Sequence, residues 1–471
     1  MNKQKENNHK EKNNTPLTLG SLIKWCGAKS DLPESKLKLK IPTVWNDSRK
    51  VTPGDVFVAI KTDNDDGHNY IDSAFKSGAV AAIVNKKAHV ECSLKDVSKL
   101  IRVTDPLKAI QKAANQYRKQ MGCLFIGVTG SNGKTTTRTF ISSVLRQGLT
   151  IGETYTNWNN HIGVPLSILK FAGDEWAGVI EMGANHVGEI HELSLITEPD
   201  IAVITNIGYG HVGLFGSLAN TTKAKFEIAD GLNRKAGFML LNGDDPRLVK
   251  GVRERNIPVV FYGFSSRCAV RPQNVSVDSV KGISFELDGY KFRLTMPGRH
   301  FLYNSLPAIY IGRRCGLPDE VIAEALIAQK AVSMRGTIEM KNGVRFILDC
   351  YNANPSSMNS GIAYLSDITE PRKRVAIVGD MLELGSYSKR LHLELGKNLA
   401  DASVQKILAV GEFAEFVAQG AVKAGFSSKS VQTAKNSEQA IAIARSIVNQ
   451  GDTVLLKGSR GVHLETIFEK F

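Results

Sequence analysis

The 471-residue sequence predicts an α/β protein with three domains, the central one built on a mostly parallel sheet that carries a phosphate-binding loop. Three observations support this prediction. The length corresponds to about three domains of roughly 150 residues each. Short apolar runs alternate with helix-length segments, a βαβ rhythm that is typical of parallel sheets. One apolar run leads directly into GVTGSNGKTTT, a glycine-rich segment of the kind that wraps phosphate.

The composition is that of a globular protein. Hydrophobic residues make up 42% and charged residues 23% of the chain. No run of 18 apolar residues occurs, and the start of the chain has no apolar stretch of the secretory type. We therefore expect a cytoplasmic protein with no stable membrane insertion. The six cysteines form no CxxC pair, which argues against a zinc cage and indicates reduced thiols.

The net charge of +14 is spread along the chain rather than concentrated in one tract. This distribution favours small anionic ligands, with no nucleic acid among the expected partners. Residues 1–15 are rich in Asn and Lys and have almost nothing to bury, so we expect a disordered tail there. An arm that contacts nucleic acid or a membrane is the alternative reading of this segment.

The first expected domain spans residues 16–121. A Pro-Gly turn precedes the apolar run 56–60, which predicts a buried strand. A helix is expected from Pro106 with Asp105 as its N-cap, because apolar residues recur at helical spacing after it.

The second expected domain spans residues 122–333. Near its end, ISFELDGYKFRLTM alternates in polarity on both sides of Asp288-Gly289, which predicts a two-residue hairpin added antiparallel to the sheet. The apolar runs that predict parallel strands are residues 124–128, 178–182, 201–205 and 238–241.

The third expected domain spans residues 334–471 and repeats the same rhythm. It predicts a small, Rossmann-like, doubly wound sheet. The strands are expected at residues 346–349, 374–378, 407–410 and 453–456.

The strongest local signal is the loop at residues 127–137, which an apolar strand enters and a helix pattern leaves. Glycines let the backbone wrap an anion, and amides at the helix start point at phosphate. Lys134 can neutralise the outer phosphates, and the Thr135 hydroxyl can hold Mg²⁺. The strict Walker pattern requires glycine where this chain has Val128, so a plain glycine-rich turn is the alternative. The expected nucleotide contacts are Gly130, Ser131, Asn132, Gly133, Lys134, Thr135 and Thr136.

The segment TGSNGKTT resembles the nucleotide loop of the Mur ligases, the ATP-dependent amide-bond-forming enzymes of peptidoglycan synthesis. The resemblance covers nearly the whole chain after the tail and implies the three-domain Mur ligase architecture. In the first domain, Asp47-Ser48-Arg49 resembles the part of the family that holds the UDP end of the substrate. Arg49 would give the diphosphate a forked donor and Ser48 a hydroxyl. A solvated arginine in a turn is the alternative.

The resemblance also implies a ligand set in the second domain. TNWNNHIGVP is similar to a family stretch whose substrate-contacting asparagines would be Asn159 and Asn160, although clustered Asn is also ordinary turn chemistry. Glu181 ends a predicted strand, and the family uses this glutamate for magnesium. A lone His is more often structural, but the resemblance makes His211 a ligand of a second Mg²⁺.

Two more residues of the second domain follow from the resemblance. GRHFLYNSLPA resembles the segment that lines the adenosine, with Phe301 where the family usually has Asn and with Asn304 retained. Lys225 falls where Mur ligases carry a lysine carbamylated by CO₂, although by composition it is an ordinary solvated helix lysine. A carbamate would serve a magnesium pair, whereas an ammonium would be repelled by it.

In the third domain, LDCYNANPSSM and GDMLELG resemble one branch of the family, the members that join D-alanyl-D-alanine to UDP-N-acetylmuramoyl-tripeptide. The resemblance implies that Arg335 reaches the ATP phosphates across a cleft and that Asp349 binds a ribose hydroxyl. The substrate contacts in this domain would be Tyr351, Asn352, Asn354, Lys457, Ser459 and Arg460.

These motifs imply a ligase that activates a carboxylate as an acyl phosphate and forms UDP-N-acetylmuramoyl-pentapeptide, ADP and phosphate. We expect a monomer that uses ATP and two Mg²⁺ ions, with meso-diaminopimelate or lysine as the third residue of the stem peptide. A folylpolyglutamate synthetase is one alternative, and a P-loop switch or assembly protein is another. The catalytic residues would be Lys134, His211, Lys225 and Arg335.

Overall fold

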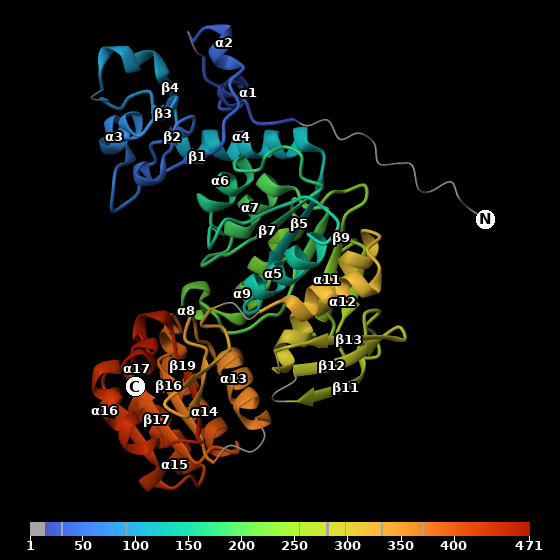
Figure 1. Ribbon diagram of the computed structural model, residues 1–471, viewed down its shortest axis with the longest axis vertical. Helices are drawn as coiled ribbons and strands as arrows, with labels where there is room; N and C mark the ends of the chain where they lie inside the picture. Colours follow the sequence, from blue (N-terminus) through green and yellow to red (C-terminus); the bar gives the residue numbers. More distant parts are fainter. Residues whose placement is uncertain are drawn as a thin grey trace, which may run out of the picture.

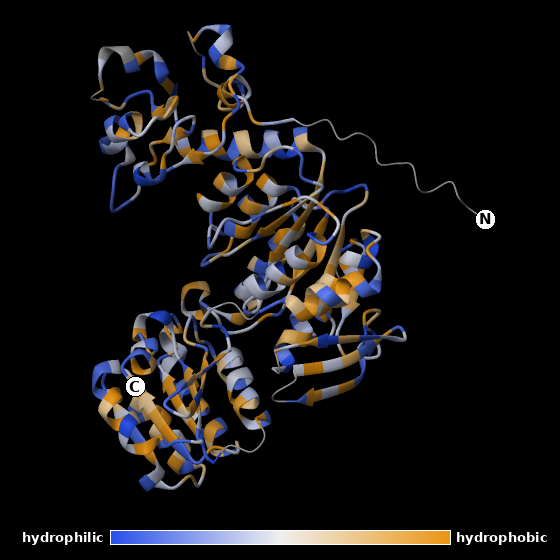
Figure 2. Ribbon diagram, in the orientation of Figure 1, coloured by the Kyte–Doolittle hydropathy of each residue, from blue (hydrophilic) through white to orange (hydrophobic). Residues whose placement is uncertain are grey.

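The computed structural model describes residues 15–29, 32–90, 92–253, 255–278, 282–296, 298–330, 333–368 and 372–471. Three bodies follow one another in chain order along the long axis of the molecule (Figure 1). Each contains a mostly parallel sheet with helices around it, and apolar residues concentrate on the strands (Figure 2). The predicted α/β class with three domains is confirmed. Of the expected tail, residues 1–14 lie outside the described part of the chain.

The first unit holds a four-stranded parallel sheet in the order β1-β2-β3-β4. Its last helix starts where the sequence predicts, because the Asp105 carboxylate accepts from the Lys108 amide and Pro106 occupies the first turn. The elements are α1 (Leu19–Trp25), α2 (Glu34–Leu37), β1 (Val44–Trp45), η1 (Ser48–Lys50), β2 (Val56–Val58), η2 (Gly67–Tyr70), α3 (Ile71–Lys76), β3 (Ala81–Asn85), η3 (Leu94–Lys99), β4 (Leu100–Val103) and α4 (Pro106–Met121).

The central unit holds a six-stranded parallel sheet in the order β10-β9-β8-β5-β7-β6. All four strands predicted for this sheet are present. Up to its edge strand the elements are β5 (Leu124–Thr129), α5 (Lys134–Leu145), β6 (Ile151–Glu153), α6 (Gly163–Leu169), β7 (Ala177–Glu181), α7 (Glu189–Thr197), β8 (Ile201–Ile204), α8 (Val212–Phe215), α9 (Leu218–Phe226), η4 (Glu227–Ala229), β9 (Phe238–Asn242), α10 (Pro246–Val252) and β10 (Val259–Tyr262).

The predicted hairpin forms, but its expected place in the central sheet is wrong. Leu287 pairs with Tyr290 across Asp288-Gly289, and both turn residues have positive φ, as a two-residue hairpin requires. The hairpin belongs to a separate antiparallel sheet, β11-β12-β13. Its apolar side chains are buried in one cluster with residues of the following helices, so it packs by its face rather than by its edge. The elements are β11 (Gln273–Asp278), β12 (Gly282–Leu287), β13 (Tyr290–Leu294), α11 (Arg299–Arg314) and α12 (Asp319–Ala328).

The third unit holds a six-stranded sheet in the order β14-β15-β19-β16-β17-β18, in which the edge strand β14 is antiparallel. The Rossmann-like sheet is therefore present, with a β14–β15 hairpin across Asn342-Gly343 that was not predicted. The elements are β14 (Thr337–Lys341), β15 (Val344–Leu348), α13 (Pro355–Asp367), β16 (Arg374–Gly379), η5 (Gly385–Tyr387), α14 (Ser388–Ala400), β17 (Lys406–Val410), α15 (Ala414–Lys423), η6 (Ser428–Ser430), β18 (Val431–Ala434), α16 (Ser437–Ile447), β19 (Thr453–Lys457), η7 (Arg460–Val462) and α17 (Glu465–Glu469).

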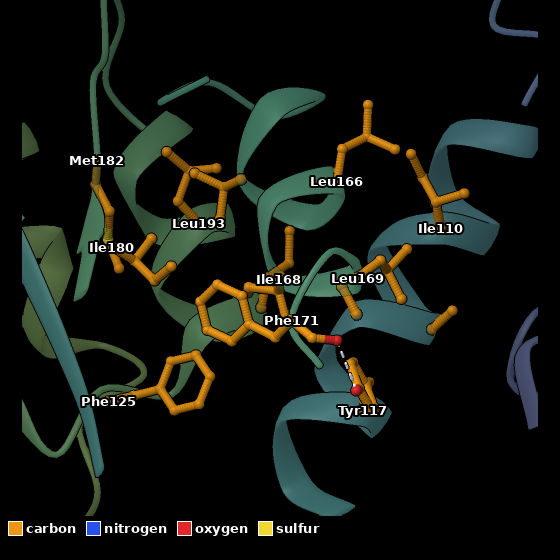
Figure 3. Close-up of a cluster of buried hydrophobic side chains, with 14 of the residues drawn as sticks. Ile110, Tyr117, Phe125, Leu166, Ile168, Leu169, Phe171, Ile180, Met182 and Leu193 are labelled. Atoms are coloured by element: carbon orange, nitrogen blue, oxygen red, sulfur yellow. Dashed lines mark hydrogen bonds between the residues drawn. The ribbon is translucent and has the colours of Figure 1, made fainter. Parts of the chain in front are cut away.

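Helix α4 joins the first unit to the central unit through one continuous core (Figure 3). Ile110 and Tyr117 are fully buried and belong to the same cluster as Leu169 and Phe125 of the central unit. The Tyr117 hydroxyl donates a hydrogen bond to the Phe171 carbonyl at 2.9 Å, which satisfies the one polar group of this contact. A shared core of this kind resists relative movement of the two units.

Within the described residues, no helix combines the length and the apolar character that crossing a membrane requires.

Candidate active site

The candidate site lies at the carboxyl ends of three neighbouring strands, β7, β5 and β8. Strand β5 ends at Thr129 and leads into the glycine-rich loop, β7 ends at Glu181, and β8 is followed by Thr205 and Asn206. Open parallel sheets bind ligands at this edge. The loop, the predicted magnesium ligand and two further polar residues therefore meet at one place.

The loop requires its glycines for conformation and for space. Gly130 and Gly133 both have positive φ, and a Cβ on either would collide with a neighbouring side chain, that of Thr205 or that of Asn304. Gly133 also starts helix α5, whose free amides face the loop. Asn304 thus lies directly against the phosphate loop, a position that is consistent with its predicted contact with a nucleotide.

Asn132 at the loop tip is held from both sides. Its amide donates to the Asn206 side chain at 2.9 Å, and Asn206 donates back to its carbonyl at 3.1 Å. Its own side chain exchanges two hydrogen bonds with that of Asn354, at 2.6 and 3.1 Å. Asn354 comes from the third unit, 222 residues away, so the third unit contacts the loop directly. Asn206 was not predicted, although it follows a predicted strand at the same edge.

Lys134 lies folded over the loop. Its ammonium donates to the Gly130 carbonyl at 2.9 Å. Burial lowers the pKa of Lys134, Glu181 opposes this effect and the positive charge of Arg335 adds to it. Arg335 belongs to the third unit, where its guanidinium lies over the Tyr351 ring, 4.2 Å from the ring centre. Its effect on the pKa of Lys134 shows that the two side chains lie near each other. Two cations from different units meet where the outer phosphates of a nucleotide would lie.

Glu181 is buried and bonded on several sides. Its carboxylate accepts from the Thr135 hydroxyl at 3.2 Å and from the Asn159 side chain at 2.9 Å. Arg138, on the buried face of α5, lies 3.6 Å from its other oxygen. The structure therefore brings together two predicted metal ligands and one predicted substrate contact. Arg138 was not predicted, because an arginine inside a helix carries no distinguishing local signal.

Lys225 is buried, with its ammonium 5.1 Å from the centre of the Phe215 ring. Burial lowers the pKa of Lys225 to about 7, and the charge of Lys134 adds to this shift while Glu189 and Glu227 oppose it. At neutral pH a large fraction of this side chain is a neutral amine. The neutral amine is the form that reacts with CO₂.

His211 contacts the carboxylate of Glu383 from the third unit. Burial lowers the pKa of His211, and Lys134 and Lys225 add to this shift, so the three side chains share one neighbourhood. Next to it the Gly213 amide donates to the Glu383 carbonyl at 2.9 Å, which fixes α8 against the third unit (Figure 1). Glu383 stands in GDMLELG but was not predicted as a site residue.

The donor set fits magnesium in part. Thr135 and Glu181 present adjacent oxygens, which suit a hard cation that takes its other ligands from phosphate and water. The His211 imidazole beside the Lys225 ammonium would not hold a second Mg²⁺, because the ammonium repels it. A carbamate on Lys225 would supply the anionic oxygens that such an ion needs. No cluster of three or more His, Cys, Asp or Glu side chains of the metal-binding kind occurs among the residues that the structure describes.

The predicted UDP-end residues lie in η1. Ser48 is buried, while the Arg49 side chain is 87% exposed. The Arg49 guanidinium binds both oxygens of Asp47, at 2.8 and 2.9 Å, so both of its donor groups are engaged within its own turn.

The predicted substrate contact Asn160 has a structural role in this structure. Its side chain accepts hydrogen bonds from the amides of residues 162 and 163 and so shapes the start of α6.

The KGSR segment braces the third unit. Lys457 is buried, lies 2.7 Å from the Asp349 carboxylate and donates to the Asn352 carbonyl. Ser459 accepts from the amide of residue 382, and Arg460 pairs with a glutamate of α17. Lys457 is thus bonded to the 349–352 loop, whereas Ser459 and Arg460 are engaged with other segments of the third unit.

Three family models match the chain in order. The model of the Mur ligase family, catalytic domain, matches residues 40–118. That of the Mur ligase middle domain matches residues 128–312, and that of the Mur ligase, glutamate ligase domain, matches residues 335–460.

The chain is also similar to individual proteins along most of its length. It is 33% identical over 427 residues to the UDP-N-acetylmuramoyl-tripeptide–D-alanyl-D-alanine ligase of Bacillus subtilis (strain 168), which covers 90% of this chain and 92% of the relative. It matches a crystal structure of MurF from Acinetobacter baumannii with a TM-score of 0.85 and 28% identity, over 97% of this chain and 98% of that chain. MurF of Thermotoga maritima in complex with ADP matches with a TM-score of 0.79 and 29% identity, over 91% and 96% of the two chains.

Proposed function

The chain belongs to the Mur ligase family, and we propose from this premise that it joins D-alanyl-D-alanine to UDP-N-acetylmuramoyl-tripeptide at the expense of ATP. The products are UDP-N-acetylmuramoyl-pentapeptide, ADP and phosphate, as expected from the sequence. The relatives with this activity in their names align along nearly the whole chain. A P-loop switch protein would not require the first and third units, and a folylpolyglutamate synthetase would not require GDMLELG.

The observation that carries the proposal is the meeting of separate units at the phosphate loop. The loop and Glu181 come from the central sheet, and Asn354 reaches the loop from the third unit. The ligation needs ATP, a nucleotide-linked carboxylate and an amine at one point, and each of these is large. A site assembled from several units suits such a reaction.

Each step of the ligation involves different side chains of the site. Lys134 and Arg335 stabilise charge on the phosphates while the substrate carboxylate attacks the terminal phosphorus, displaces ADP and forms an acyl phosphate. The amine of the dipeptide then attacks the acyl carbon, and the tetrahedral intermediate expels phosphate. Asn159, bonded to Glu181, positions the substrate carboxylate. Asn304 and Asp349 hold the nucleoside.

Magnesium would supply charge neutralisation and orientation of the phosphate oxygens. Thr135 and Glu181 would hold one ion, and His211 with a carbamylated Lys225 would hold the second. Supporting this, Lys225 is buried and its pKa is lowered to about 7, so its amine is reactive near neutrality. We further propose that the protein acts as a cytoplasmic monomer, where ATP is available and where its six cysteines stay reduced.

The test is direct. Purified protein receives ATP, Mg²⁺, D-alanyl-D-alanine and UDP-N-acetylmuramoyl-tripeptide containing either meso-diaminopimelate or lysine, and the pentapeptide and phosphate are quantified. We expect stoichiometric formation of both with at least one tripeptide. Release of phosphate without pentapeptide would favour the switch protein, and addition of glutamate to folate would favour the synthetase.

A further inference from the structure

Helix α8 belongs to the central unit by sequence, but it lies beside the third unit (Figure 1). Its first residue, Val212, is fully buried in the hydrophobic cluster that contains Met381 and Leu384. Among the described residues, every other buried member of this cluster comes from the third unit. The Tyr209 ring packs against the same cluster. By burial, this helix is therefore part of the core of the third unit. We call residues 209–216 the docking segment.

Further contacts join the docking segment to the third unit along its length. The Gly213 amide donates to the Glu383 carbonyl at 2.9 Å. The Tyr387 hydroxyl donates to the Gly216 carbonyl at 3.4 Å, and the Tyr387 ring centre lies 6.0 Å from that of Tyr209. Both ends of the segment and its middle therefore contact the third unit.

Gly213 lets the two backbones approach each other closely. A Cβ at this position would lie 2.6 Å from the Gly385 amide nitrogen and 2.7 Å from the Glu383 carbonyl oxygen. Both are backbone atoms, which cannot turn aside as the end of a side chain can. Because Gly213 is a helical residue of α8, alanine suits its own conformation, and only the third unit would exclude it. The docking contact therefore explains the glycine.

Two residues at this contact hold an unfavourable backbone conformation. His211 has a φ of +58° and Glu383 a φ of +61°, values in the left-handed region that residues other than glycine rarely adopt. Their side chains contact each other across the boundary between the units. Such conformations persist where the surrounding structure holds them. The contacts that Val212 and Gly213 make next to this pair provide that support.

The docking segment is also tied to the central unit on both sides. Before it, the Gly208 amide donates to the Ser131 hydroxyl of the phosphate loop at 2.8 Å. After it, the Asn220 side chain on α9 donates to the Phe215 carbonyl at 2.8 Å. The Phe215 ring centre lies 5.1 Å from the Lys225 ammonium. The segment therefore connects the core of the third unit to the proposed catalytic residues of the central unit.

We propose that the docking segment is a structural part of the third unit and that Val212 and Gly213 are positioning residues for the reaction. Through these two residues, docking of the third unit holds His211 beside Lys225. The effect on the reaction rests on the proposed function, whereas the assignment of the segment to the third unit does not. Docking then supplies more than the side chains of the third unit, because it also orders residues that the central unit contributes to the site.

Two alanine substitutions test to which unit the segment belongs. Val212→Ala should speed amide hydrogen exchange in residues 209–216 and in α14 by at least about tenfold, because it removes buried methyl groups from the core of the third unit. The urea midpoint of tryptophan fluorescence should not change, since all four tryptophans lie in the first and central units. Val203→Ala on β8, which is equally buried, is the matched control and should lower this midpoint without affecting α14.

Gly213→Ala tests the positioning role. It should lower kcat for pentapeptide formation about ten- to hundredfold, because the site residues are displaced. KM for the UDP substrate should stay within about twofold, since its proposed contacts at the UDP end lie in the first unit. The docking segment should exchange faster than in the wild type, which is a readout independent of activity. Gly148→Ala is the matched control and should change neither quantity, because this glycine is exposed and its Cβ would meet only the end of the Leu317 side chain.

The outcomes separate the two proposals. A lower tryptophan midpoint in Val212→Ala, or unchanged hydrogen exchange in that variant, would show that the segment is not part of the third unit and would overturn the inference. A Gly213→Ala protein with the kcat or the hydrogen exchange of the wild type would overturn the positioning role. If Val212→Ala does not fold, Gly213→Ala still decides, because it removes no buried group. A wild type that forms no pentapeptide contradicts the proposed function, while the exchange and urea comparisons still test the assignment of the segment.

Discussion

His300 offers a test of how the central and third units are joined. It lies in the first turn of α11, and its ring centre is 4.1 Å from that of Phe301, with the rings tilted by 39°, and 6.4 Å from that of Tyr364 in the third unit. Burial lowers the pKa of His300 to about 4, with the Asp349 charge opposing this shift and the Lys457 charge adding to it. The imidazole is therefore neutral in the folded protein at pH 5 and protonated in the unfolded chain.

The sign of the effect follows from proton linkage. Between pH 6.5 and about 4 the unfolded chain binds a proton at this position and the folded protein does not, so the free energy of unfolding falls as the pH falls. The full shift corresponds to about 3 kcal/mol, of which about 2 kcal/mol is lost between pH 7 and pH 5. The ring is partly exposed, and solvent screening reduces the effect observed over this interval to about 1 kcal/mol.

The assay compares urea unfolding of the wild type and of His300→Gln at pH 7 and pH 5, followed by tryptophan fluorescence. All four tryptophans precede residue 177, so this signal reports on the first and central units, to which His300 belongs. The variant should lose about 1 kcal/mol less than the wild type over this interval. His89→Gln, which removes an exposed imidazole of the first unit, should behave like the wild type. Equal losses in the wild type and in His300→Gln would refute the reasoning.

Three further predictions concern the reaction. Lys134→Ala should abolish pentapeptide formation with an unchanged circular dichroism spectrum, since it removes the ammonium held over the phosphate loop; activity within about tenfold of the wild type would contradict its role. Lys225→Ala should lose most activity, and formate or acetate should partly restore it by replacing the carbamate oxygens. Near-normal turnover of the unrescued Lys225→Ala protein would rule out the carbamate. Arg49→Ala should raise KM for the UDP substrate about ten- to hundredfold, as expected for the loss of a charged contact to phosphate, and leave KM for D-alanyl-D-alanine unchanged. An equal rise for both substrates would speak against Arg49 at the UDP end.

Elements with a strong local signal could be predicted from the sequence. The Asp105-Pro106 start of α4 and the Asp288-Gly289 hairpin depend on capping and on positive φ, which neighbouring residues determine. The β14–β15 hairpin carried a comparable signal in Asn342-Gly343, and it could have been predicted by the same rule. The sheet to which a hairpin belongs is different, because it depends on which distant side chains cover its apolar face.

The same distinction between local signals and long-range contacts holds for the candidate site. The phosphate loop follows from a contiguous motif, whereas the neighbours of its residues come from far along the chain. Thr135 meets Glu181 over 46 residues, and Asn132 meets Asn354 over 222. Such contacts follow from sheet order and domain docking, which no local pattern contains. Glu383 was therefore missed as a partner of His211, although its motif had been identified.

The contacts between the central and third units show why the site depends on both. The side chain of Asn354 holds the loop residue Asn132, Glu383 touches His211, and the Tyr387 hydroxyl donates to the Gly216 carbonyl beyond α8. Two of these three contacts involve residues of the proposed catalytic machinery. Movement of the third unit would therefore alter the phosphate loop and the surroundings of His211 together. Water hydrolyses an acyl phosphate, so this intermediate should form only when the acceptor amine is within reach. Because the phosphate loop depends on contacts from the third unit, the acyl phosphate forms when that unit is in place beside it.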